Sequence, residues 1–271
     1  PSELPPKALL RTPSNLITPH PHSTTQISEM KLFVLSTVLA AASAFQAAPC
    51  SVRQGSSLNA LATKADLKAL ATTSNPVLNF YDPLELSSTT IWGESNEASI
   101  AWLRQAEIKH GRVAMAAFVG YCVQANGIHF PGPQNMAGDV SQFSGSPPEQ
   151  WDALPDAAKW QIILFVGFLE WFSESAGTHY MRGGVPGAFP DFSDHKELVP
   201  HPVPFNLYDP FGLSKNKKPE KLERGLVSEV NNGRLAMIGI FGFMAEQKVD
   251  GAVPLLKGVV PHYSGEFMAP F

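Results

Sequence analysis

Two nine-residue stretches of this chain carry the same polar residues at the same spacing, each directly before an apolar segment. The first runs from Glu107 to Met115 and the second from Glu229 to Met237, and both fit Glu-x-x-(His or Asn)-Gly-Arg-x-Ala-Met. Carboxylate, imidazole and amide groups are donors to metal ions, and carboxylate and amide oxygens suit a hard cation such as magnesium. We interpret the two stretches as an internal repeat that brings metal-ligating groups onto two apolar helices.

The glutamate and the arginine of one copy cannot pair with each other. They are five residues apart in the sequence, which separates them by roughly 140° around a helix. Two such helices packed with a twofold relation instead bring Glu107 to Arg234 and Glu229 to Arg112, so that each charge is neutralised. On this interpretation, loss of Arg234 would strand Glu107. The small residues that would permit close crossing are Gly111, Ala114, Gly233, Ala236 and Gly239.

Three helices are predicted to position these groups, at about residues 98–125, 156–175 and 221–249. The first would be roughly 42 Å long at 1.5 Å per residue. Asp-Pro turns precede the first and third helices, at Asp82-Pro83 and Asp209-Pro210. No unbroken apolar run is as long as a simple membrane span, because the charged and ligand residues lower the average hydropathy. The sequence predicts an all-α membrane protein with three transmembrane helices, the first and third crossed and related by pseudo-twofold symmetry.

The start of the chain has the composition of targeting segments, which direct a protein to a cell compartment. Residues 1–29 are rich in Pro, Ser and Thr and are predicted to be disordered. Residues 30–44 combine a basic start, a short apolar core and small residues at the end, as a signal peptide does. Residues 45–60 contain no acidic residue, which favours a plastid transit segment over ordinary secretion. The mature domain is predicted to cover residues 61–271.

Composition argues against several classes of function. Charged residues make up 16% of the chain, apolar residues 44%, and the formal net charge is −4, so no basic excess indicates nucleic-acid binding. Of the two cysteines, Cys50 lies in the segment expected to be removed, so Cys122 has no disulfide partner. We do not predict an enzyme: a metal-dependent membrane enzyme is a remote alternative, because H-E-x-x-H, G-x-S-x-G, C-x-x-C and P-loop motifs are missing.

The paired motifs resemble the first and third membrane helices of the light-harvesting chlorophyll-binding proteins. The segment from Gly177 to Gly187 and the end from Gly265 to Phe271 are similar to the fucoxanthin chlorophyll a/c branch of diatom-type algae. The resemblance implies an antenna that binds chlorophyll a, chlorophyll c and fucoxanthin or a related xanthophyll. Its implied partners are a photosystem core, other antenna subunits and thylakoid lipid. The alternative is a photoprotective member that dissipates excitation when the lumen acidifies, suggested by the acidic residues Asp139, Glu149, Asp152, Asp156 and Glu266.

The resemblance also ranks the candidate ligands to chlorophyll magnesium. The strongest are Glu107, His110, Glu229 and Asn232, with Arg112 and Arg234 as ion-pair partners. Glu170 in the middle helix follows a Gly-x-x pattern that matches the family, and no Lys or Arg lies within a helical turn of it. Near the end of the third helix the spacing leaves Glu246 and Gln247 both open. The remaining candidates are Gln161, Gln124 and His262.

Basic residues set the predicted orientation. No Lys or Arg occurs between Arg112 and Lys159, whereas the loop before the third helix carries Arg182, Lys196, Lys215, Lys217 and Lys218. The positive-inside rule therefore places that loop and the N-terminal arm on the stromal side of the plastid thylakoid membrane. Three crossings would then place the C-terminus in the lumen.

Overall fold

The computed structural model describes residues 63–129, 145–195, 197–198 and 218–269. Within these ranges the chain is helical and has no strand. The predicted address segments up to residue 60, Asp139 and the Asp209-Pro210 turn lie outside the described residues.

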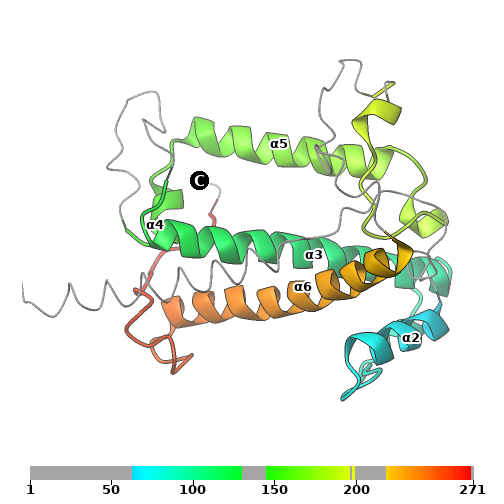
Figure 1. The fold of residues 1–271 in the computed structure, drawn as a ribbon. Helices are drawn as coiled ribbons and strands as arrows, with labels where there is room; N and C mark the ends of the chain where they lie inside the picture. Colours follow the sequence, from blue (N-terminus) through cyan, green and yellow to red (C-terminus); the bar gives the residue numbers. More distant parts are fainter. Residues whose placement is uncertain (1–62, 130–144, 196, 199–217, 270–271) are drawn as a thin grey trace, which may run out of the picture.

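Two long helices form the centre of the molecule. Helix α3 spans Asn96–Ala125 and helix α6 spans Pro219–Lys248, thirty residues each. They lie side by side and run in the same direction (Figure 1). The side chain of Ser95 accepts the Ala98 N–H at the start of α3, and Pro219 occupies the first turn of α6, where a missing N–H leaves no bond unmade. Each helix begins two residues before the start predicted from the sequence.

Helices α3 and α6 touch through equivalent positions of the two motif copies, which are 122 residues apart (229 − 107 = 122). A Cβ built on Gly233 would lie 2.9 Å from the Cα of Gly111. Ten residues further along each helix, the ring of Tyr121 stacks on that of Phe243 with centroids 4.7 Å apart. Equivalent residues therefore meet at two levels, roughly 15 Å apart along the helices. Such self-complementary contact is what a twofold axis running along the helix pair produces.

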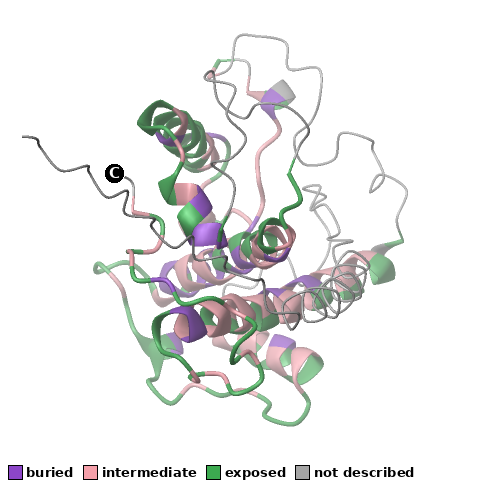
Figure 2. Cartoon of the chain, turned by 90° about the vertical axis from the view of Figure 1, so that its left-hand side faces the viewer, coloured by how far each residue is buried: buried purple, intermediate pink, exposed green. Residues whose placement is uncertain are grey.

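The third long helix, α5, spans Asp156–Ser175, as the sequence predicts, and stands away from the α3–α6 pair along most of its length (Figure 1). Its apolar side chains are widely exposed, with Leu164 at 64% and Phe165 at 58% (Figure 2). Only its C-terminal end enters a small aromatic core, where the fully buried ring of Phe172 stacks on Phe192 at 4.4 Å. From Gln161 to Phe168 every residue of α5 is exposed, whereas Lys159 near its N-terminal end is buried.

In the part of the chain that the structure describes, no helix has both the length and the apolar character of a candidate membrane span.

One shorter helix precedes α3 and another lies between α3 and α5. Helix α2 spans Lys64–Ser74 and helix α4 spans Pro147–Asp152. Helix α2 starts with a capping box between Thr63 and Asp66, and at the start of α4 the carboxylate of Glu149 accepts the backbone N–H of Ser146 at 2.7 Å. Neither helix is among the three predicted from the sequence, although Thr63-x-x-Asp66 and Ser146-x-x-Glu149 are patterns typical of a helix start. Single 3-10 turns occur at Leu86–Ser88 (η1), Tyr180–Arg182 (η3) and Phe192–Asp194 (η4).

Candidate functional site

Two ion pairs join α3 and α6 reciprocally on either side of the Gly111–Gly233 contact. The guanidinium of Arg234 reaches Oε1 of Glu107 at 2.8 Å from Nε and 2.7 Å from Nη2. The Nε of Arg112 lies 2.5 Å from Oε1 of Glu229, whose side chain is only 5% exposed. The structure therefore contains both cross-helix pairs that the five-residue spacing predicts.

The two motif copies differ in how many cations neutralise their glutamate. Arg104, one turn before Glu107 on α3, donates to Oε2 of Glu107, so both carboxylate oxygens have an arginine partner. The equivalent position on α6 is Leu226 (104 + 122 = 226), and only Oε1 of Glu229 is bonded within the described residues. The expectation that loss of Arg234 alone strands Glu107 is therefore wrong, because Arg104 remains.

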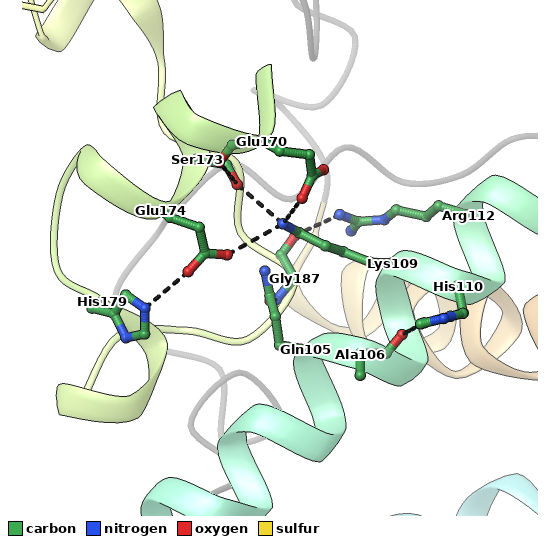
Figure 3. A network of polar contacts seen from close by, with 10 residues as sticks. All are labelled: Gln105, Ala106, Lys109, His110, Arg112, Glu170, Ser173, Glu174, His179 and Gly187. Atoms are coloured by element: carbon green, nitrogen blue, oxygen red, sulfur yellow. Dashed lines mark hydrogen bonds and ion pairs between the residues drawn. The ribbon is translucent and has the colours of Figure 1, made fainter. Parts of the chain in front are cut away.

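His110 and Asn232 each point a lone pair away from their helix. The Nδ1 of His110 lies 2.7 Å from the Ala106 carbonyl (Figure 3). A carbonyl only accepts, so Nδ1 carries the proton and Nε2 keeps its lone pair in the neutral ring. Likewise, Nδ2 of Asn232 donates to Ser228 Oγ at 3.3 Å, and its Oδ1 accepts no hydrogen bond from the described residues. Both donors are thus held by the preceding helical turn, which orients them for a metal ion.

The cation that the sequence did not show beside Glu170 comes from another helix. The ammonium of Lys109 on α3 lies 2.6 Å from Oε2 of Glu170 on α5 (Figure 3). Lys109 falls inside the first motif copy, between Glu107 and His110, at a position that the motif itself leaves free. A search within one helical turn of Glu170 could not find a partner that lies 61 residues away.

A polar face of α3 that the sequence analysis did not single out fixes the segment after α5. The backbone of Gly187 donates from N to Gln105 Oε1 and accepts at O from Arg112 Nη1, both at 2.5 Å. Gly187 has φ +81°, and a Cβ there would come within 2.9 Å of Ile108. Since Gln105, Lys109 and Arg112 follow i, i+4, i+7 spacing, they share one face of α3. That spacing was the signal in the sequence from which this polar face could have been predicted.

The two candidates at the end of α6 have different roles in the structure. Glu246 is 2% exposed, and its two oxygens accept the N–H groups of Gly251 at 2.9 Å and Val253 at 2.7 Å. Gln247 is fully buried, and its side-chain amide has no hydrogen-bond partner among the described residues. Of the two, only Gln247 therefore has an uncommitted donor. The other three candidates, Gln124, Gln161 and His262, are exposed.

The Asp-Pro turn before α3 is a compact unit stabilised by its own carboxylate. Asp82 accepts the N–H of Leu86 at 3.0 Å and that of Ser87 at 2.9 Å. Hydrogen bonding from Ser87, followed by that from Leu86, lowers the pKa of Asp82 below its usual value. The turn is therefore built around the charged form of Asp82.

The geometry can be compared with known proteins. Residues 66–248 match the family model described as "Chlorophyll A-B binding protein". A fucoxanthin-chlorophyll a-c binding protein of Trieres chinensis is 32% identical over 233 residues, which cover 84% of this chain and 98% of the relative. Proteins F and B of the same description from Phaeodactylum tricornutum are each 32% identical, covering 81% and 85% of this chain and 96% and 100% of their own lengths. All three relatives are described as chloroplastic. This chain therefore belongs to the chlorophyll a/b-binding protein family.

Proposed function

We propose that this chain is a light-harvesting antenna protein of the thylakoid membrane. It binds chlorophyll a, chlorophyll c and a fucoxanthin-type xanthophyll, and it passes excitation energy to a photosystem. The names of the relatives support the pigment classes, since they are fucoxanthin-chlorophyll a-c binding proteins. They also support a role in pigment binding and not in catalysis.

One observation carries the proposal: two helices whose glutamates are neutralised across their contact, each followed one turn later by a neutral donor. A glutamate with a cross-helix arginine presents oxygen to magnesium without a net charge in an apolar environment. His110 Nε2 and Asn232 Oδ1 present lone pairs that need no counter-charge. These donor groups would suit the magnesium of a bound chlorophyll, which would supply the absorption of light.

The bound pigments supply the absorption of light, and the chain's residues hold them at fixed positions. At the helix pair, Oε2 of Glu229, Nε2 of His110 and Oδ1 of Asn232 have no hydrogen-bond partner among the described residues. Glu107 would serve through a lone pair of an oxygen that already accepts from arginine. The side chains that ring α5, such as Leu164 and Phe165, are apolar and exposed, which suits contact with pigments and lipid.

We further propose that α3, α5 and α6 cross the membrane. At 1.5 Å per residue, the thirty residues of α3 and of α6 extend about 45 Å, more than the roughly 30 Å of a bilayer core. The N-terminal arm lies in the stroma and the C-terminus in the lumen. In sealed thylakoids, protease added from the stromal side should cleave the arm and spare the tail after Lys248. Cleavage of that tail from the stromal side would reverse the orientation.

The central experiment is reconstitution of residues 61–271 with a mixed chlorophyll a, chlorophyll c and fucoxanthin extract. Pigments that co-purify with the protein are then extracted and quantified. Energy transfer is tested by the excitation spectrum of chlorophyll a emission, which should contain bands of fucoxanthin and chlorophyll c. A colourless product, or an excitation spectrum with chlorophyll a bands only, would refute the antenna function.

A further inference from the structure

The contact between α3 and α5 contains an ion pair that the twofold-related motif does not account for. Lys109 directs all its donors toward α5: Nζ lies 2.6 Å from Glu170 Oε2, 3.1 Å from Ser173 Oγ and 3.3 Å from Glu174 Oε1 (Figure 3). An ammonium group has three N–H donors, so this set satisfies it completely. The Lys109 side chain is thus fixed in place and is not a solvated surface charge.

Of the two carboxylates that Lys109 contacts, only Glu170 has an oxygen without a hydrogen-bond partner in the part of the chain that the structure describes. Glu174 uses one oxygen for Lys109 and the other for Nε2 of His179, at 2.9 Å. Glu170 uses Oε2 alone, and its side chain is 57% exposed. Its Oε1 accepts no hydrogen bond from the described residues.

The helix surface beside Glu170 is also bare. Gly167 lies three residues earlier and therefore on the same face of α5. A Cβ built on Gly167 would meet no atom within 4 Å. A flat ring can approach the α5 backbone at this place and reach Oε1 of Glu170.

A common rule emerges from the candidate ligands on the three long helices. Glu107, Glu229 and Glu170 each contact a cation from a different helix, namely Arg234, Arg112 and Lys109. Among the described residues, the neutral donors His110 and Asn232 bond only to their own helix. Charged donors therefore come with a counter-charge, as an apolar environment requires, and neutral donors do not.

We infer that Lys109 is the positioning residue of a third charge-compensated pigment site, at Glu170. This inference rests on the proposed function. Lys109 holds Oε2 of Glu170, cancels its charge and leaves Oε1 as the donor to the magnesium of a chlorophyll-type pigment. The same contact ties the C-terminal half of α5 to α3, beside the Gly187 anchor.

The test compares reconstituted variants by the number of chlorophylls per polypeptide and by pigment circular dichroism. Lys109→Met removes the counter-charge and keeps a similar chain length, so it should lose one chlorophyll. Lys109→Arg keeps the charge and should retain most of that pigment. The control is Lys221→Met on the first turn of α6, an exposed lysine without an ion pair in the described residues, which should bind pigment like the wild type.

The double variant Lys109→Met/Glu170→Gln separates charge compensation from a merely structural role. A neutral amide oxygen needs no cation, as Asn232 illustrates, so the double variant should recover the chlorophyll that Lys109→Met loses. If Lys109→Met fails to refold, recovery of folding and pigment by the double variant supports the inference equally. Wild-type pigment content in Lys109→Met, or no recovery in the double variant, would overturn it. Failure of the wild type to bind chlorophyll would instead remove the proposed function.

Discussion

The contact between Gly111 and Gly233 makes a quantitative prediction for Gly233→Ala. The added Cβ would lie 2.9 Å from the Cα of Gly111, and this atom belongs to a backbone that cannot rotate away. Ordinary van der Waals contact begins at 3.4 Å, so α3 and α6 must separate by about 0.5 Å at this level. Overpacking of this kind costs about 1–3 kcal/mol. Alanine returns up to about 1 kcal/mol through its higher helix propensity.

Gly120→Ala is the matched control. Gly120 lies on the same helix, α3, and a Cβ built there meets no atom within 4 Å. It should gain helix propensity without a clash and be neutral or stabilising. The two variants should therefore differ by about 1–3 kcal/mol in stability, or roughly 2–12 °C in the thermal midpoint of a domain of this size.

The assay is thermal loss of pigment circular dichroism in the reconstituted protein, recorded at one scan rate for both variants. Gly111→Ala, whose Cβ would lie 3.1 Å from Gly233 Cα, should fall between the other two. Equal midpoints for Gly233→Ala and Gly120→Ala would mean that the helices do not approach each other at Gly111 and Gly233. The site geometry described above would then be refuted.

Two further predictions follow from the polar contacts, and a third from the proposed antenna function. Arg112→Leu should destabilise the protein by about 3–5 kcal/mol, because it leaves the buried Glu229 without a counter-charge. Arg234→Leu should cost only about 1 kcal/mol, since Glu107 keeps Arg104. Equal losses of denaturation midpoint in the two variants would contradict this asymmetry. Burial, and then the hydrogen bond to Asp152, raise the pKa of Tyr263 from 10.0 to about 12. The neutral form of Tyr263 therefore stabilises the folded state fully below pH 10, and this contribution disappears as the pH rises through about 12. The difference in phenolate absorbance between wild type and Tyr263→Phe measures this pKa, and an ordinary tyrosine pKa would refute the prediction. If the protein is an antenna, its fluorescence lifetime should stay constant between about pH 7 and pH 5. A shortened lifetime on acidification would favour the photoprotective alternative.

Local sequence patterns predicted most of what is helical. The bounds of α5 agree with the sequence prediction, and those of α3 and α6 differ by at most two residues. Apolar runs, the Pro at a first turn and the Asn-Gly stop after α3 are all short-range signals. The capping patterns at the start of α2 and α4 are equally local. They were missed because α2 lies in the predicted N-terminal arm and α4 lies in a segment dense in Gly and Pro.

The contacts of the site were predictable only where the repeat supplied long-range information. The repeat allowed Glu107 and Arg234 to be paired, although they are 127 residues apart. No repeat connects Lys109 with Glu170, or Gln105 with Gly187, so one sequence alone could not pair them. The choice between Glu246 and Gln247 depended on backbone N–H groups of the turn after α6, whose position no spacing rule specifies.

The two reciprocal ion pairs between α3 and α6 constrain the order in which this protein can assemble. Every contact across the pair joins parts of the chain more than a hundred residues apart, with α5 made in between. Until residue 234 has been threaded into place, Glu107 has only its neighbour Arg104, and Arg112 lacks its carboxylate. The polar contacts of α3 are therefore complete only when α6 is in place, so the last long helix to be made completes the first.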